Sequence, residues 1–211
     1  MSKKIVDYDL DNLIDALTEN VTDEIKGFED IVNLDGAINR ELYVGEITSG
    51  SGSTIDGYIR FWNQYDKNNN IPIEKRSPIK IYIDSPGGSL SDTFTIIDSI
   101  RMSKTPIWTI CTGTAYSGGF FIFIAGERRI AYPHSSFLYH EGYTSNGGDA
   151  NKFRNYAEFY QKEMQQLEDI TLLYTNISKE TYDKIKKDDF WMTAKEALAL
   201  NVCDEIAEEL V

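Results

Sequence analysis

The apolar residues of this chain recur with two periods, one typical of β-strands and the other of amphipathic helices. Residues 79–83 (Ile-Lys-Ile-Tyr-Ile) place β-branched residues at every second position, which predicts a strand with one buried face. Further strands are expected at 42–44, 107–111, 129–132 and 136–140. Apolar residues at three- and four-residue steps predict helices over 8–28, around Ile55 to Tyr65, and over 152–174.

Residues 117–125 are apolar on every side and therefore predict a short helix buried in the core. Another helix is expected to begin at Ser89, and the capping box from Thr193 to Glu196 predicts the start of a short C-terminal helix. Gly113 is expected to end the strand that begins at Ile107. Strands that alternate with helices in this way predict an α/β fold, in which helices pack against a largely parallel sheet.

The helix over 152–174 is the clearest of the expected helices and would be about 33 Å long at 1.5 Å per residue. It carries one apolar stripe and is polar elsewhere, which is typical of a helix that packs against another subunit or projects from its domain. The helix over 8–28 precedes all the expected strands. We therefore divide the chain into an N-terminal helical segment, 1–38, and one folded domain, 39–211.

The charge and the cysteines of the chain narrow the classes of partner and the compartment. The 211 residues include 21 Lys and Arg against 34 Asp and Glu, a net charge of −13, which argues against binding to nucleic acid or to an anionic membrane surface. No apolar run approaches the roughly 20 residues of a membrane span, and the first residues do not form a signal peptide. Cys111 and Cys203 lie in apolar runs far apart, which predicts buried free thiols and a cytoplasmic location.

Two glycines follow the strand at 79–83, in the sequence Pro86-Gly87-Gly88. A tight turn between a strand and a helix explains them without any function. The functional interpretation is that Gly87 supports the turn and that the Gly88 N–H points into a cleft, where it would stabilise a developing oxyanion.

A serine with two glycines behind it stands between the strand at 107–111 and the buried helix, in Tyr116-Ser117-Gly118-Gly119. Ser117 could be only the N-cap of that helix. A cap does not require two glycines, however, whereas a nucleophile does, because a substrate must reach the Ser117 Oγ and the Gly118 N–H together. We therefore interpret Ser117 as a candidate nucleophile and Gly118 as a second oxyanion donor.

A serine nucleophile needs a base, and the chain contains only two histidines. His134 follows a proline and is expected to be exposed, whereas His140 ends the strand at 136–140 and is the candidate base. A third group must orient the imidazole. Asp188 and Asp189 are both candidates, and spacing alone does not exclude Asp183.

Taken together, these segments resemble the ClpP-like family, the proteolytic subunits of the Clp protease. The resemblance rests on four blocks in the same order, which are Ile83–Gly88, Gly113–Gly119, Phe137–His140 and Asp189–Ala194. It implies the ClpP/crotonase-like α/β fold, with repeated β-β-α units and a protruding handle helix over 152–174. It also implies a Ser117-His140-Asp189 triad, with Asp189 as the acid, and no metal or cofactor.

The resemblance further implies a homo-oligomer of heptameric rings, stacked as a tetradecamer around a chamber in which unfolded polypeptides are cleaved. The sequence departs from the family at Gly118, where a bulkier residue is usual, and at Glu141-Gly142, where a Gln-Pro pair is usual. The first departure suggests a less constrained backbone. Residues 1–38 look helical rather than like the axial hairpin that contacts an ATP-dependent unfoldase, so an unfoldase partner stays an open question.

The function predicted from the sequence is therefore that of a serine endopeptidase. One alternative is a non-catalytic ring subunit that has kept the ClpP-like fold for assembly. A second is a crotonase-type acyl-CoA enzyme, which would use the same N–H donors with glutamates as acid and base. A third is a membrane-facing Ser-Lys signal-peptide peptidase, in which His140 would have no role.

Overall fold

The computed structural model describes residue 36, residues 38–142 and residues 148–211. The helix expected over 8–28 lies outside these residues. The strands are β1 (Glu41–Val44), β2 (Ile79–Ser85), β3 (Ile107–Tyr116), β4 (Arg128–Ala131), β5 (Ser136–Tyr139), β6 (Phe190–Thr193) and β7 (Glu205–Ile206). The helices are α3 (Ser51–Asn68), α4 (Leu90–Met102), α5 (Gly118–Ile124), α6 (Ala150–Tyr174), α7 (Lys179–Ile185), α8 (Ala194–Ala199) and the 3₁₀ turn Ile73–Lys75.

The sheet is almost entirely parallel, as predicted. Its strands follow the order β1-β2-β3-β4-β7, and every neighbouring pair in this order is parallel. β5 pairs with the end of β3 and carries β6 as its antiparallel partner. The isoleucines of β2 alternate between the buried core and more exposed positions, which is the period-two pattern that predicted this strand.

The strand β3 does not end at Gly113, contrary to the expectation from the sequence. It runs from Ile107 to Tyr116 and passes through Gly113. A Cβ at this position would lie 2.5 Å from the Asp84 Oδ1, and the same oxygen accepts hydrogen bonds from the Thr114 N–H and hydroxyl. Gly113 is therefore there to make room for the Asp84 side chain, beside the register shift between β2 and β3, and not to break the strand.

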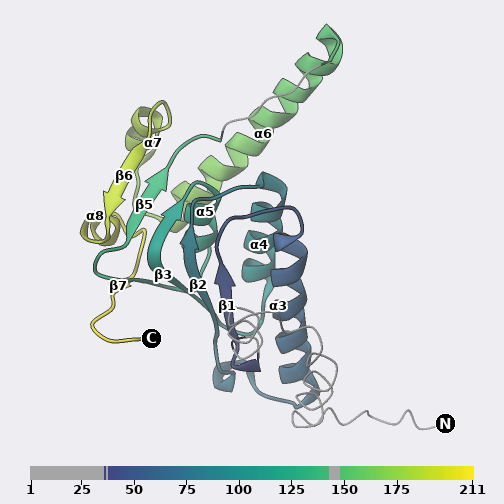
Figure 1. Cartoon of the computed structure of the whole chain (residues 1–211), viewed down its shortest axis with the longest axis vertical. Helices are drawn as coiled ribbons and strands as arrows, with labels where there is room; N and C mark the ends of the chain where they lie inside the picture. The colour runs from purple at the N-terminus through teal and green to yellow at the C-terminus, as the bar shows by residue number, and fades with distance from the viewer. Residues whose placement is uncertain (1–35, 37, 143–147) are drawn as a thin grey trace, which may run out of the picture.

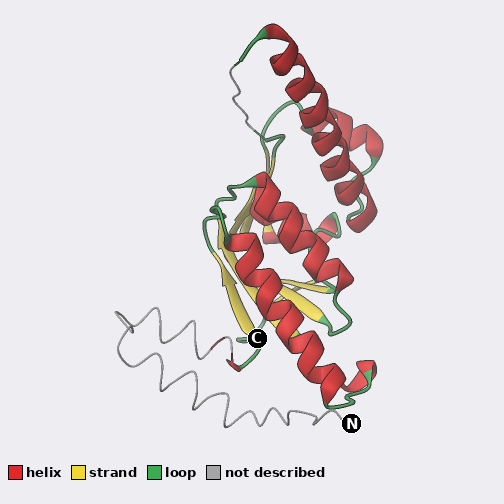
Figure 2. Cartoon of the chain, turned by 90° about the vertical axis from the view of Figure 1, so that its right-hand side faces the viewer, coloured by secondary structure: helices red, strands yellow, loops and turns green. Residues whose placement is uncertain are grey.

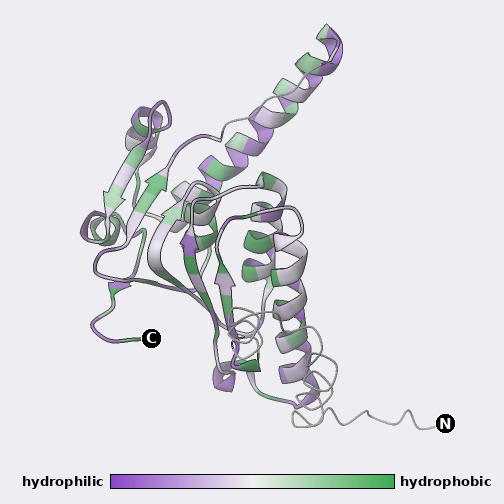
Figure 3. Cartoon of the chain, viewed as in Figure 1, coloured by the Kyte–Doolittle hydropathy of each residue, from purple (hydrophilic) through white to green (hydrophobic). Residues whose placement is uncertain are grey.

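Helices cover the sheet and build the core with it. Figure 2 shows α3 and α4 lying together across one face of the sheet. All seven residues of α5 are buried, which confirms the predicted core helix. Figure 3 shows that hydrophobic residues concentrate on the strands and on α4 and α5. Cys111 and Cys203 are both buried and both free, as expected.

The long helix α6 projects beyond the sheet (Figure 1) and begins two residues before the predicted start. Only its inner end is buried in the domain, through Leu167, Glu168 and Thr171. That end is also held by Arg129, a buried residue of β4 that donates a hydrogen bond of 2.5 Å to the Tyr174 carbonyl. Among the residues that the structure describes, no helix combines the length and the apolar character that a membrane span requires.

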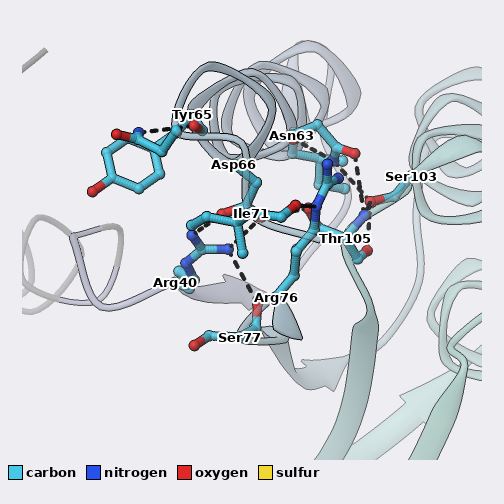
Figure 4. A network of polar contacts seen from close by, with 11 residues as sticks. Arg40, Asn63, Tyr65, Asp66, Ile71, Arg76, Ser77, Ser103 and Thr105 are labelled. Atoms are coloured by element: carbon cyan, nitrogen blue, oxygen red, sulfur yellow. Dashed lines mark hydrogen bonds and ion pairs between the residues drawn. The ribbon is translucent and has the colours of Figure 1, made fainter. Parts of the chain in front are cut away.

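A buried ion pair anchors the start of the sheet to α3 (Figure 4). Asp66 is fully buried and accepts hydrogen bonds from Arg40, at 2.5 and 3.0 Å, and from the Thr105 hydroxyl, at 2.6 Å. The Arg40 guanidinium also lies 4.3 Å from the centre of the Trp62 ring. Burial alone would raise the pKa of Asp66, but these hydrogen bonds lower it below its ordinary value.

The segment between β1 and α3 pairs with the glycine turn that follows β2. The Ile47 N–H donates to the Gly87 carbonyl at 2.9 Å, and the Ser89 N–H donates to the Ile47 carbonyl at 2.7 Å. Gly88 lies between these two hydrogen bonds with a φ of 145°, and a Cβ there would collide with the Ile47 carbonyl. Both the conformation and the close approach require glycine at position 88.

We expect Asp66→Asn to lower the free energy of unfolding by about 3–5 kcal/mol, because it leaves a buried Arg40 charge without its counter-ion. Urea denaturation followed by tryptophan fluorescence measures this change. The control is Lys184→Ala, which breaks an exposed pair with Glu180 and should cost below about 1 kcal/mol. Similar small losses in both variants would contradict a structural role for the buried pair.

We expect Gly88→Ala to lower the melting temperature by about 5–12 °C, because the new Cβ strains the backbone and displaces Ile47. Gly57→Ala is the matched control, since that glycine lies on the exposed face of α3 with no atom within 4 Å of an added Cβ. It should leave the melting temperature unchanged or raise it slightly. Thermal unfolding followed by circular dichroism compares the two, and an unchanged Gly88→Ala protein would refute the analysis.

Candidate active site

Ser117 occupies a strained corner between β3 and α5. Its φ of 53° and ψ of −121° are unusual for a residue other than glycine. Its N–H donates to the Leu138 carbonyl of β5 at 3.0 Å, and its own carbonyl accepts from the Phe120 N–H at 3.0 Å. The side chain makes no capping hydrogen bond, although Ser117 stands at the N-cap position. The interpretation of Ser117 as a simple helix cap therefore does not explain its side chain.

Glycines surround Ser117 because the backbone is packed against other side chains there. A Cβ on Gly87 would lie 2.6 Å from the Ser117 Cβ, and one on Gly119 would lie 2.8 Å from the Ser85 Cβ. A Cβ on Gly118 would lie 2.5 Å from the Thr93 Oγ1. The expectation that Gly118 leaves the backbone less constrained is therefore wrong, because this residue is buried and closely packed.

Two backbone N–H groups near Ser117 have no acceptor among the residues that the structure describes. The Gly88 N–H lies between the two hydrogen bonds to Ile47 but takes part in neither, and the Gly118 N–H begins α5. Gly88, Gly118 and Ser117 line the same cleft. Two donors beside one hydroxyl are the arrangement that can bind the oxyanion formed when that hydroxyl attacks a carbonyl group.

His140 lines this cleft with Ser117 and is half-buried, one residue beyond the end of β5. The other histidine, His134, is exposed, as expected. Within residues 38–142 and 148–211, no hydrogen bond joins His140 to Ser117 or to Asp189. The structure therefore brings the predicted nucleophile and base to one cleft without a direct contact between them.

The pairing of β5 with β6 separates the three candidate aspartates. These antiparallel strands pair Leu138 with Trp191 and Tyr139 with Phe190, and the next step in this register sets Asp189 opposite His140. Asp188 is one residue further, so its side chain would extend toward the other face of the ladder. Asp183 lies on α7, where hydrogen bonds from Lys186 and Lys179 lower its pKa to about 2. Asp189 is exposed and does not line the cleft.

Aromatic contacts hold the strand and the helix that flank Asp189. The hydroxyl of Tyr139, next to His140, donates to the Tyr182 hydroxyl of α7 at 2.5 Å in the core. The Tyr116 ring, next to Ser117, meets the Trp191 ring of β6 edge to face at 5.2 Å. The residues beside the candidate nucleophile and base thus contact the elements on both sides of the candidate acid.

The cleft has a volume of about 660 Å³, and its far wall is formed by α6. The α6 residues are Tyr156, Phe159, Tyr160, Glu163 and Leu167. The sequence pattern revealed part of this stripe, but it was interpreted only as a surface for packing or projection. Tyr160 also donates a hydrogen bond to the Gly142 carbonyl, two residues after His140. Among the described residues, no group of three or more His, Cys, Asp or Glu side chains is arranged to hold a metal ion.

The geometry provides a hydroxyl, an imidazole and two amide donors in one cleft, which are the groups of an acyl-transfer site. Residues 72–210 match the family model described as Clp protease. The chain is 30% identical over 176 residues to the ATP-dependent Clp protease proteolytic subunit 3 of Synechococcus sp. (strain CC9902), which covers 80% of this chain and 82% of that protein. It is 28% identical over 176 residues to the corresponding subunit 2 of Prochlorococcus marinus (strain MIT 9312), with 80% and 81% coverage. The chain therefore belongs to the Clp protease family, as a divergent ClpP-like protein with the α/β fold of that family.

Proposed function

We propose that this protein is a serine endopeptidase that cleaves unfolded polypeptides through Ser117, His140 and Asp189. The observation that carries the proposal is the single cleft lined by Ser117, His140, Gly88 and Gly118. Membership of the Clp protease family supports a ClpP-like peptidase or ring subunit, and the cleft favours the peptidase.

In the proposed reaction, the Ser117 Oγ attacks the scissile carbonyl carbon while His140 accepts its proton. The carbonyl oxygen becomes an oxyanion, which the N–H groups of Gly88 and Gly118 stabilise. His140 then returns the proton to the leaving amine as the peptide bond breaks and an acyl-enzyme remains. A water molecule, deprotonated by His140, releases the second product and restores Ser117.

Asp189 would orient His140 and stabilise the imidazolium that forms during the reaction. The β5–β6 register supports this role, because its next step pairs the two residues. Catalytic hydrogen bonds are often long or absent before substrate binds and shorten in the substrate complex. The proposal therefore requires that the His140 side chain move toward both partners when the cleft is filled.

We also propose that the chain assembles as stacked heptameric rings in the cytoplasm, with α6 as the contact between rings. Phe153, Phe159 and Leu173 support this assembly, because each is more than half exposed on α6 and large apolar side chains in such positions mark interfaces. An ATP-dependent unfoldase would then supply polypeptides to the chamber. The relatives named above are proteolytic subunits of an ATP-dependent protease, which supports that partner.

A non-catalytic ring subunit is the second candidate function. The observation that favours it is the lack of any hydrogen bond between His140 and Ser117 or Asp189 among the described residues. Such a subunit would keep the fold and the assembly but would not react with active-site probes.

We expect a fluorophosphonate probe to label the wild-type protein at Ser117. Ser117→Ala should abolish labelling, and His140→Ala should slow it by about 10²-fold or more, because the hydroxyl then lacks its base. Intact-mass spectrometry measures the labelled fraction over time. His134→Ala is the matched control and should label at the wild-type rate, since His134 is exposed outside the cleft. An assembled wild-type protein that is not labelled would favour the non-catalytic ring subunit.

We expect Asp189→Asn to lower kcat for a fluorogenic peptide by about 10²–10⁴-fold, because the imidazole loses the carboxylate that orients it. Asp188→Asn removes the same charge from the neighbouring residue and should change kcat by less than about twofold. Steady-state kinetics on the two variants compare these positions directly. A larger loss in Asp188→Asn would show that the strand register does not continue beyond Tyr139 and Phe190.

A further inference from the structure

The wall that α6 contributes to the cleft contains one carboxylate, Glu163, among the described residues that line it. Glu163 is half-buried, and no hydrogen bond or ion pair to it is found within the described part of the chain. No lysine or arginine of those residues lines the cleft, and the sequence from 143 to 147 contains none either. The cleft therefore holds an acidic group for which the described residues provide no counter-ion.

A second glutamate on the same helix shows what a structural carboxylate looks like in this protein. Glu168 is buried where α6 meets α7, and it forms ion pairs with Lys179 and Lys186. Glu163, five residues earlier, is positioned toward the cleft instead of toward α7 and has no such partners. A role in holding α6 to the domain thus explains Glu168 but not Glu163.

The surroundings of Glu163 favour a positive charge. The rings of Tyr156 and Tyr160 are stacked with their centres 6.3 Å apart on the same wall of the cleft. Aromatic faces attract cations, and lysine and arginine side chains also bury their aliphatic stems against them. Burial, Tyr156 and the charges of Glu141 and Glu163 raise the pKa of the Tyr160 hydroxyl, which shows that Glu141 adds to the negative potential here.

Burial also raises the pKa of the Glu163 carboxyl, since water is partly excluded from the charged form. The free cleft therefore bears the cost of a partly desolvated carboxylate. A cation bound beside it would remove this cost, and the energy would appear as selectivity for the ligand that carries the cation.

We propose that Glu163 is a specificity-determining residue that selects a lysine or arginine side chain of the polypeptide substrate close to the scissile bond. This inference rests on the proposed function, because the same cleft contains Ser117. The basic side chain would lie along Tyr156 and Tyr160, with its charge at the Glu163 carboxylate and the scissile carbonyl at Ser117.

The first test measures binding in the full-length Ser117→Ala protein, so that it does not depend on turnover. The probes are two fluorescein-labelled peptide sets, identical except that one position at a time carries lysine or its neutral analogue norleucine. We expect about five- to tenfold tighter binding of lysine at one position, measured by fluorescence anisotropy. Equal affinities at all positions, or no binding of either set, would overturn the inference.

The second test assigns this preference to Glu163. Glu163→Gln in the same background should abolish the lysine preference, and Glu163→Lys should invert it in favour of a glutamate peptide, which a misfolded protein would not do. Glu158→Gln is the matched control, because Glu158 is exposed on α6 and does not line the cleft. A lysine preference that survives in Glu163→Gln, or that disappears in Glu158→Gln, would count against the assignment.

Hydrolysis by the wild-type protein separates this inference from the proposed function. Faster cleavage of lysine than of norleucine peptides, with a ratio that falls about five- to tenfold in Glu163→Gln, supports both. A lysine preference in binding without hydrolysis by the assembled wild-type protein supports Glu163 as a binding residue and refutes the endopeptidase. Hydrolysis without any lysine preference refutes only the role of Glu163.

Discussion

The central constraint of this structure is the pairing of one strand, β3, with three other strands. Its full length follows β2, whereas its opposite edge pairs first with β4 at Trp108–Cys111 and then with β5 at Thr114–Tyr116. The change of partner directs β5 and β6 away from the main sheet. Ser117 comes directly after this branch, and its N–H is bonded to β5. The end of β5 therefore brings His140 into the cleft that Ser117 also lines.

The sequence predicted the features that depend on local pattern. The isoleucines of β2, the apolar residues of α5 and the capping box at Thr193 each formed the expected element, because their signal lies within a few neighbouring positions. Gly113 was misinterpreted for the opposite reason. Its partner Asp84 lies 29 residues earlier, and nothing near Gly113 in the sequence indicates that a carboxylate must pass beside it.

The candidate site shows the same division between local and distant information. Ser117, His140 and the glycines could be selected from short motifs, whereas the choice among Asp183, Asp188 and Asp189 could not be made from spacing. The structure separates them through the pairing of β5 with β6, segments about 50 residues apart in the sequence. Glu163 was not found at all, because its position in the cleft depends on the direction in which α6 leaves the domain.

The attachment of α6 at one end alone makes it a lever. Its inner end is held by Leu167, Thr171 and the hydrogen bond from Arg129, while its outer half extends away from the domain. The residues from Tyr156 to Glu163 lie between these two parts and form a wall of the cleft. A small tilt of the outer half therefore changes the width of the cleft, so whatever contacts the tip of α6 also sets how much space a bound chain has beside Ser117.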